Sequence, residues 1–233
     1  MKIDESKLIF YTGAPGSKWS ATAHLITMNN RYPINISDYS DDKVYTHSDI
    51  GISHLGAYWG PGNGVGEQFD NLSSMSKENI LLEIDKPYKD KNWEQYRLIK
   101  CHHFSTQLDY IVETFPNSKI IIILRPDIIC YKGWVSAGGF DGITYPDYKT
   151  FYKDQETLEK KIDEENFHAR DFIHTQNLDM HVIREIYWKK VWNIDRDTEE
   201  KDRYMRSIEM RQTRGIPRWN FDTTISHYNF EGL

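Results

Sequence analysis

A glycine-containing loop between an apolar run and a helical segment holds the residues with the clearest chemical potential. Residues 13–20 have the sequence Gly-Ala-Pro-Gly-Ser-Lys-Trp-Ser, which combines small residues, hydroxyls and one lysine. The run 8–11 before it is typical of a strand, and 21–28 after it of a helix. Such a unit aims backbone N–H groups and the positive end of a helix dipole at one point. An anion, most often a phosphate, is the natural occupant of that point.

The spacing in the loop argues against a magnesium-dependent triphosphate site. That site needs a contiguous Gly-Lys-Ser/Thr, whereas Trp19 here separates Lys18 from Ser20. It also needs an apolar strand that ends in Asp, whereas the apolar run 120–124 ends in Arg125. A cation at that point suits a second phosphate and repels Mg²⁺. The sequence therefore favours a metal-free site with two anion pockets.

A histidine follows a second apolar run. Residues 96–103 have the sequence Tyr-Arg-Leu-Ile-Lys-Cys-His-His, so Lys100 and His102 stand at the carboxyl end of a predicted strand. Ligands of open α/β sheets bind at that edge. A histidine there can take a proton from an attacking hydroxyl near neutral pH. A capping or surface histidine is the alternative interpretation.

The apolar runs at 8–11, 97–101 and 119–124 are continuous, which is typical of strands buried on both faces of a parallel sheet. A helix is predicted over residues 105–115, with Ser105 as its N-cap. This strand–helix–strand unit predicts an α/β fold, a three-layer sandwich with a central parallel sheet. We expect a further helix from Arg125-Pro126-Asp127 to about Val135, with the proline at its first position. An amphipathic helix is expected through Leu178, Val182, Ile186 and Val191.

The stretch from residue 32 to residue 70 has no clear period and collects six glycines. Long irregular loops in compact domains are usually functional or disordered, and the aromatic residues argue against simple disorder. We expect it to form a wall for an acceptor, with His54, Tyr58 and Trp59 as candidate contacts. A loop packed on itself is an equally good interpretation.

Composition narrows the class of protein. The 233 residues hold 29 basic and 35 acidic side chains, a net charge of −6, which argues against a nucleic-acid-binding face. The two cysteines, Cys101 and Cys130, are expected to be buried free thiols, which suits a reducing compartment. The charged N-terminus does not resemble a signal peptide, and the run 120–124 is too short to span a bilayer. We expect a soluble, cytoplasmic protein and leave its oligomeric state open.

Three motifs, in this order, resemble those of the sulfotransferases that use 3′-phosphoadenosine 5′-phosphosulfate (PAPS). Family members carry Pro-Lys-Ser-Gly-Thr-Thr in the first loop, where this chain has Pro-Gly-Ser-Lys-Trp-Ser at 15–20. They carry Leu-Ile-Lys-Thr-His, and this chain has Leu-Ile-Lys-Cys-His at 98–102. They carry Arg-Asn-Pro-Lys-Asp, and this chain has Arg-Pro-Asp at 125–127. A C-terminal Arg-Lys-Gly pattern followed by Trp is echoed at 213–219.

The resemblance implies a P-loop-like fold and a role for each matched position. His102 would be the base that deprotonates the acceptor hydroxyl, with Lys18 in place of the family's loop lysine and Lys100 beside the base. Arg125 would bind the 3′-phosphate, and Lys132 could substitute for the family's helix serine. The residues expected to contact PAPS are Gly13, Ala14, Pro15, Gly16, Ser17, Lys18, Trp19, Ser20, Arg125, Lys132, Gly133, Arg214 and Gly215.

The expected function is transfer of a sulfuryl group from PAPS to a hydroxyl or amine of a small-molecule, glycan or peptide acceptor, without a metal. We expect one domain over residues 1–233, with an irregular acceptor-side insertion at about 32–90. Two alternatives stay open. One is a metal-dependent P-loop kinase, and the other is a relative of the fold that binds a ligand without catalysis, which the altered loop lysine keeps in view.

Overall fold

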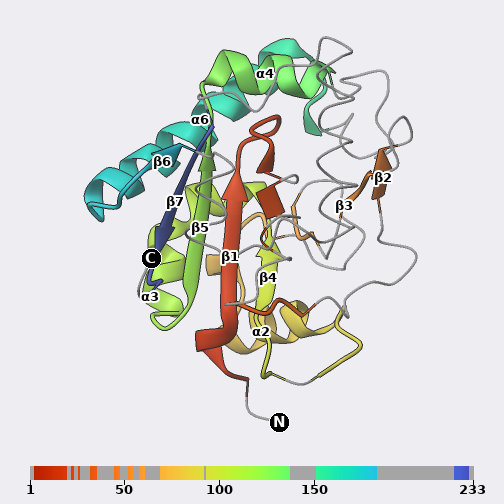
Figure 1. Cartoon of the computed structure of the whole chain (residues 1–233), viewed down its shortest axis with the longest axis vertical. Helices are drawn as coiled ribbons and strands as arrows, with labels where there is room; N and C mark the ends of the chain where they lie inside the picture. The colour runs from red at the N-terminus through yellow and green to blue at the C-terminus, as the bar shows by residue number, and fades with distance from the viewer. Residues whose placement is uncertain are drawn as a thin grey trace, which may run out of the picture.

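The computed structural model of the chain describes residues 3–19, 22–23, 26, 32–35, 45–47, 52–54, 58–60, 69–91, 93–136, 151–182 and 223–230. Within these residues the central feature is a five-stranded sheet with the order β4-β1-β5-β7-β6 (Figure 1). Its bounds are β4 (Arg97–Lys100), β1 (Leu8–Gly13), β5 (Lys119–Leu124), β7 (Thr224–Tyr228) and β6 (His181–Val182). The α/β class predicted from the sequence is confirmed.

The sheet is mixed, so the expectation of a parallel sheet is wrong for two of its strands. β1 pairs in parallel with both β4 and β5. β7 pairs antiparallel with β5, and β6 antiparallel with β7. β7 has the sequence Thr-Ile-Ser-His-Tyr, in which polar residues interrupt the apolar ones. It therefore lacks the continuous apolar run that marks a strand buried on both faces.

The two faces of the sheet are both buried, as the continuous runs predict. Leu8 and Phe10 pack into one hydrophobic cluster, whereas Ile9 and Tyr11 pack into the other. β1 extends two residues beyond the predicted 8–11, and its last residue, Gly13, lies opposite Ile123 of β5. The strand thus leads directly into the glycine-containing loop.

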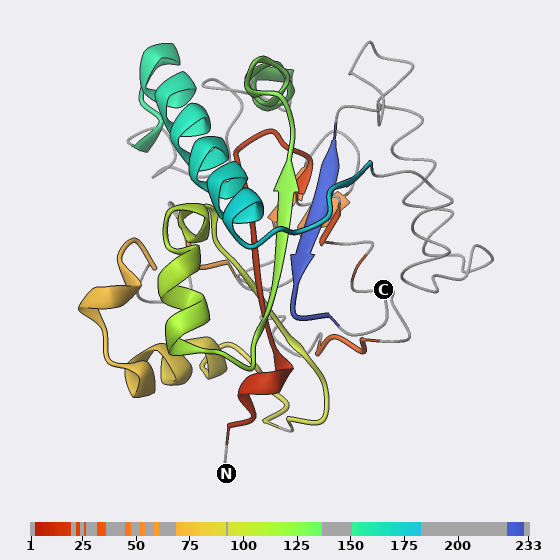
Figure 2. The ribbon, with the colours of Figure 1, turned by 90° about the vertical axis from the view of Figure 1, so that its left-hand side faces the viewer.

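Helices cover one face of the sheet, and another lies beyond its carboxyl edge. Figure 2 shows α2 (Lys77–Asp85), α3 (Leu108–Thr114) and α6 (Gln155–Thr175) on one side of the strands. α4 (Asp127–Ser136) follows the carboxyl end of β5. The second face is packed by side chains that include Trp19, Ala23 and Ile26. Residues 20, 21, 24 and 25 of this segment lie outside the described residues, so a complete three-layer sandwich remains a prediction.

The predicted helix 105–115 begins later than expected. A 3₁₀ helix, η4 (His102–Thr106), comes first, and α3 begins at Leu108. The Ser105 hydroxyl donates to the carbonyl oxygen of His102 (2.8 Å). Because this hydroxyl bonds back along the chain, it does not act as the predicted N-cap.

The predicted helix that ends near Val135 is present as α4. The Cys130 amide donates to the carbonyl oxygen of Pro126 at 2.9 Å. Pro126 is therefore the capping residue before the helix rather than its first residue. Its fixed φ and missing N–H suit the start of a helix in either place.

The amphipathic helix expected through Leu178 and Val182 is not present over residues 178–182, because α6 ends at Thr175 and β6 follows at His181–Val182. Leu178 lies in the turn after α6, Val182 lies on β6, and residues 183–222 are outside the described part. α6 ends in a Schellman motif, in which the amides of Asn177 and Leu178 donate to the carbonyls of His174 (3.1 Å) and Ile173 (2.9 Å). Asn177 takes the left-handed conformation (φ +51°) that this motif requires.

The segment 32–90 is not irregular throughout. α2 lies within it, and the Ser76 side chain caps this helix by accepting from the Asn79 amide (3.2 Å). Two short strands, β2 (Tyr45–His47) and β3 (Ile52–His54), pair antiparallel in the same segment. The boundaries of the single predicted domain remain a prediction.

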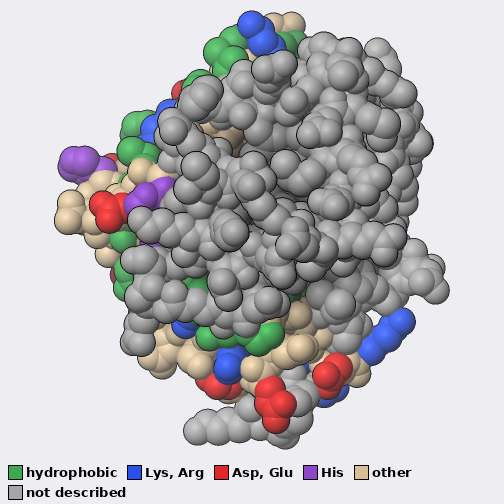
Figure 3. Space-filling model, in the orientation of Figure 1, with side chains coloured by type: hydrophobic (Ala, Val, Ile, Leu, Met, Phe, Trp, Pro, Cys, Tyr) green, Lys and Arg blue, Asp and Glu red, His purple; other side chains and the backbone are tan. Residues whose placement is uncertain are grey.

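Cys101 and Cys130 are free and buried, as expected. Among the described helices, none is both long enough and apolar enough to cross a bilayer. On the face seen in Figure 3, the coloured acidic and basic side chains along the lower edge lie interspersed. That part of the surface carries no basic stripe.

Candidate functional site

The loop after β1 has the backbone of an anion-binding turn. Gly16 has a φ of +77° and Lys18 a φ of +67°, while Ser17 between them keeps a negative φ. A backbone that alternates in this way directs successive N–H groups toward the same side. The Thr22 amide then donates to the Lys18 carbonyl (3.0 Å), so a helical turn follows directly. The predicted strand–loop–helix order is present as far as the described residues extend.

Close packing explains why glycine stands at positions 13, 16 and 133. A Cβ on Gly16 would lie 1.9 Å from the Cys130 carbonyl oxygen, inside α4. A Cβ on Gly133 would lie 2.8 Å from the Gly16 carbonyl oxygen, and one on Gly13 would lie 2.8 Å from the Ile123 carbonyl oxygen. The loop is therefore pressed between β5 and α4, and any side chain at these positions would push it away.

Arg125 lies against this loop. Its Nη1 donates to the Gly16 carbonyl oxygen at 3.2 Å, and the residue is only 1% exposed. The expected cation at the end of β5 therefore faces the glycine-containing turn rather than bulk solvent. It reaches the loop because β1 and β5 are neighbouring parallel strands that end at the same edge.

His102 approaches the loop from the opposite side, after β4. Its Nδ1 lies 2.5 Å from the Gly13 carbonyl oxygen. Since a carbonyl only accepts, Nδ1 carries the proton and Nε2 keeps its lone pair. Burial lowers the pKa of His102 to about 3, partly offset by the bond to Gly13. The imidazole is therefore neutral at physiological pH, in the tautomer that a general base at Nε2 requires.

Aromatic rings cover this imidazole. The Trp19 ring centroid lies 4.0 Å from that of His102, and the Tyr58 centroid lies 5.7 Å from it. Trp19 is held in place by stacking on Tyr11 (5.7 Å) and by the Tyr11 hydroxyl, which donates to the Trp19 carbonyl oxygen. His102 is consequently 2% exposed.

No protein-family model, curated protein or solved structure matches this chain. The functional assignment therefore depends on the motifs and on the geometry that the structure gives them.

The structure brings several predicted residues together and separates others. The loop residues 13–19, His102, Arg125 and Gly133 lie around one edge of the sheet. Lys100 is buried at the end of β4, and its backbone pairs with that of Tyr58. Lys132 is exposed on α4. His54 belongs to β3. Ser20, Arg214 and Gly215 lie outside the described residues.

Trp59 does not line an open acceptor surface. It is fully buried, and its ring stacks on Phe69 with centroids 5.8 Å apart. Its backbone amide donates to the Lys100 carbonyl oxygen (2.9 Å). The ring contact with Phe69, which belongs to the same segment, fits the interpretation of a loop packed on itself, whereas Tyr58 contacts the candidate base.

Two polar residues near this edge, Asn166 and Glu165, were not predicted from the sequence. Asn166 donates to the Arg125 carbonyl oxygen at 3.0 Å and to Asp127 Oδ1 at 2.6 Å. Beside it, Glu165 is buried, and neither carboxyl oxygen has a hydrogen-bond partner among the described residues. Burial raises the pKa of Glu165 well above its usual value.

The sequence contained a pattern that could have indicated that these two residues are buried. The apolar residues of α6 recur at helical spacing, and the positions between Ile162 and Ala169 that continue this stripe hold Glu165 and Asn166. Polar residues in an apolar stripe are candidates for a buried polar network.

Neither a readily ionised thiol nor a cluster of metal-ligand side chains occurs in the described part of the chain. Burial raises the pKa of Cys130 to about 12 and that of Cys101 well above its usual value, so neither thiol ionises readily. No group of three or more His, Cys, Asp or Glu side chains arranged to hold a metal ion occurs within it.

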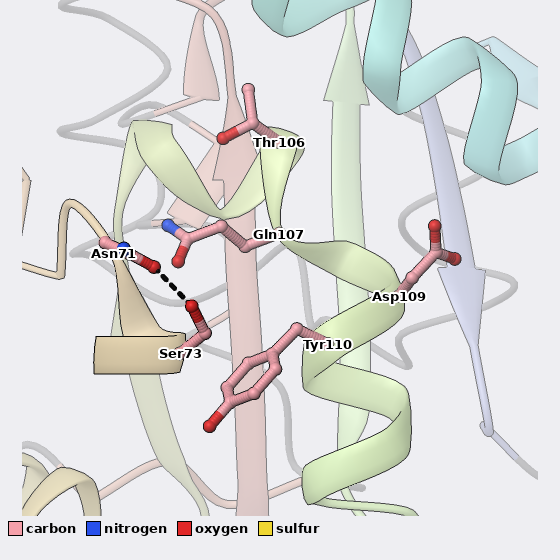
Figure 4. Close-up of a pocket in the computed structure, with 6 residues that line it drawn as sticks. All are labelled: Asn71, Ser73, Thr106, Gln107, Asp109 and Tyr110. Atoms are coloured by element: carbon pink, nitrogen blue, oxygen red, sulfur yellow. Dashed lines mark hydrogen bonds between the residues drawn. The ribbon is translucent and has the colours of Figure 1, made fainter. Parts of the chain in front are cut away.

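A small polar pocket lies between η3 (Leu72–Ser74) and the start of α3. It has a volume of about 220 Å³ and is lined by Asn71, Ser73, Thr106, Gln107, Asp109 and Tyr110 (Figure 4). The Ser73 hydroxyl donates to Asn71 Oδ1 (2.7 Å). None of the predicted site residues lines this pocket, so it is separate from the glycine-containing loop.

Proposed function

We propose that the chain transfers a sulfuryl group from PAPS to a hydroxyl or amine of an acceptor. One observation carries the proposal. The parallel strands β4, β1 and β5 end at one edge, where His102 and Arg125 each bond to a carbonyl of the loop after β1. This is the juxtaposition that the three motifs imply.

The loop suits a phosphate-like group. The alternating signs of φ at Gly16, Ser17 and Lys18 favour a concave set of N–H donors. The Ser17 hydroxyl is completely buried and has no hydrogen-bond partner among the described residues. An orphaned hydroxyl at this point is explained if a ligand oxygen accepts from it.

Arg125 supplies the second anion contact. In the proposal its guanidinium binds the 3′-phosphate, while the loop and Lys18 hold the 5′ end of the nucleotide. Two separate cationic groups would then distinguish a nucleotide phosphorylated at both ends from one with a single phosphate. PAPS supplies the sulfuryl group, and the protein contributes positioning and charge stabilisation.

His102 aligns and deprotonates the acceptor in this proposal. Nδ1–H stays bonded to Gly13, and Nε2 takes the proton from the acceptor. Because His102 is 2% exposed, the acceptor reaches Nε2 only after the ring of Trp19 or Tyr58 moves. Lys100, at the end of the same strand, is the other candidate cation near the transferred group.

The buried state of His102 favours one alternative, a binding protein of the same fold without catalysis. It would hold the doubly phosphorylated nucleotide and never expose the base. Conversion of His102 to Ala separates the two possibilities. In an enzyme, transfer from radiolabelled PAPS falls by roughly 100- to 1000-fold while 3′-phosphoadenosine 5′-phosphate (PAP) still binds. Binding of PAP by the wild type without transfer to any acceptor would support the alternative.

The Arg125→Ala variant tests the binding site itself. Calorimetric titration should show a loss of PAP affinity of about 100-fold and a loss of AMP affinity below about threefold, because only PAP has the 3′-phosphate. Arg170→Gln is the matched control, since Arg170 is an exposed arginine of α6. An equal loss of affinity for both nucleotides would show that Arg125 does not bind the 3′-phosphate.

A further inference from the structure

Helix α6 reaches the backbone of Arg125 through Asn166. This side chain is 1% exposed, and its amide nitrogen donates to the Arg125 carbonyl oxygen (3.0 Å) and to Asp127 Oδ1 (2.6 Å). Both partners only accept, so the NH₂ group of the amide must face them. The bond ties α6 to the connection between β5 and α4, about 40 residues earlier in the chain.

The surrounding contacts make Asn166 the buried part of a small network. Arg170, one turn later on α6, donates to the same Asp127 oxygen at 2.7 Å, but this pair is exposed. Cys130 Sγ lies 3.4 Å from the Arg125 carbonyl oxygen. An exposed ion pair contributes little, whereas a buried donor fixes the position of the groups it bonds.

The guanidinium of Arg125 is held closely by its surroundings. Nη1 donates to the Gly16 carbonyl oxygen at 3.2 Å. A Cβ on Gly133 would lie 3.0 Å from that nitrogen and 2.8 Å from the Gly16 oxygen. Because α4 packs closely on this nitrogen and on the loop at Gly133, a small movement of the Arg125 backbone would change the contact of its guanidinium with the loop.

We propose that Asn166 is a positioning residue for the anion site. By holding the carbonyl of Arg125, it sets the place of the guanidinium against the loop at Gly16. It thereby controls both the order of the loop and its preference for a nucleotide with a 3′-phosphate. The second part rests on the proposed function, in which Arg125 binds that phosphate, whereas the first part does not.

Asn166→Asp is the most direct variant, because it keeps the shape and removes the NH₂ donor. At pH 8 it also places a second carboxylate beside Asp127. Hydrogen exchange of the ligand-free protein should then be at least tenfold faster in peptides covering residues 13–19. Exchange in residues 8–12 of β1 should be unchanged.

Two further variants keep the test decisive. Asn166→Ala removes the donor without adding charge and should give the same result if the first variant does not fold. Arg170→Gln removes the exposed partner of Asp127 and leaves the Asn166 bonds, so it should match the wild type. In Asn166→Asp, burial and the neighbouring Asp127 carboxylate should raise the pKa of the introduced carboxyl. Lowering the pH to 5.5 should therefore restore protection of the loop, because the protonated carboxyl can again donate to the Arg125 carbonyl.

Nucleotide binding gives the second readout. The ratio of PAP to AMP affinity should fall about tenfold in Asn166→Asp and Asn166→Ala, with AMP affinity unchanged. A wild type that does not prefer PAP would overturn the proposed function, and hydrogen exchange would still decide the role of Asn166. Faster exchange confined to α4 and α6, with residues 13–19 unchanged, would show a purely structural role and overturn the proposal.

Discussion

The surroundings of His102 set its protonation state and move its pKa away from the ordinary value of a histidine. Burial against Trp19 and Tyr58 keeps the ring neutral, while the bond to Gly13 selects the tautomer. Keeping this ring neutral has a cost in stability at acid pH. Unfolded histidine takes up a proton below a pH of about 6.5, whereas His102 in the folded protein stays neutral down to about pH 3.

This difference predicts an acid-sensitive stability. Between pH 6.5 and pH 3 the unfolded state binds one more proton at this position, so the free energy of unfolding decreases as the pH falls. One such proton contributes about 1.4 kcal/mol per pH unit. Urea unfolding between pH 7 and pH 5 should show a shallower dependence in His102→Gln than in the wild type. The exposed His168 is the control, and an unchanged slope in His102→Gln would contradict the account.

Glu165 has the opposite effect. Its folded pKa is raised by burial, so above a pH of about 4.3 the unfolded state releases a proton that the folded state retains. Stability therefore decreases as the pH rises through this range. Glu165→Gln should be more stable than the wild type at pH 8, by about 1 kcal/mol or 2–4 °C in Tm, and the gap should close near pH 4.5. Asp163→Asn, an exposed change on the same helix, should show no such pattern, and a gap independent of pH would count against a buried acid.

At the scale of elements, the contact between the loop and α4 is the tightest in the candidate site. Gly16 needs both its left-handed φ and the absence of a Cβ, which would meet the Cys130 carbonyl. Gly16→Ala should therefore lower stability by at least about 2 kcal/mol, or roughly 4–8 °C in Tm. Thermal unfolding measures this directly.

A change to glycine at a second residue with a left-handed backbone conformation is the control for Gly16→Ala. Asn177, just after the end of α6, has a φ of +51°. Asn177→Gly should retain or slightly raise the stability, because glycine adopts this conformation freely. Equal Tm values for Gly16→Ala and the wild type would mean that the loop is not pressed on α4.

The elements that the sequence predicted are those with an uninterrupted physical signal. β1, β4 and β5 were predicted because strands buried on both faces need continuous apolar residues. β7 was not predicted because its polar residues alternate with apolar ones. α6 was not predicted because its apolar residues form only a narrow stripe among many charged ones. The start of α3 was misplaced because the Ser105 hydroxyl bonds to the His102 carbonyl instead of capping a helix.

The candidate site was predicted in part for a related reason. His102, Arg125 and the loop follow directly from strand ends, so parallel pairing alone brings them together. Asn166 acts from a helix about 40 residues further along the chain, and only the tertiary packing of α6 on α4 shows its bond to Arg125. The burial of His102 beneath Trp19 likewise depends on ring packing that no spacing rule contains.

At the scale of the whole molecule, the proposed site lies between two strand ends. β4 and β5 flank β1, so His102 and Arg125 approach the loop from opposite sides. The helices α4 and α6 close the Arg125 side, and the aromatic rings close the His102 side. Binding of a ligand with charge at both ends should therefore stabilise the whole sheet edge rather than one loop.

A thermal-shift measurement with PAP and with ATP, each with and without Mg²⁺, tests the central claim most directly. A ligand present at about 100 times its Kd stabilises the folded state by about 2.7 kcal/mol, which corresponds to roughly 5–10 °C in Tm. The account predicts that PAP produces such a shift without Mg²⁺ and that Mg²⁺ does not increase it. A shift with ATP and Mg²⁺ but none with PAP would contradict it.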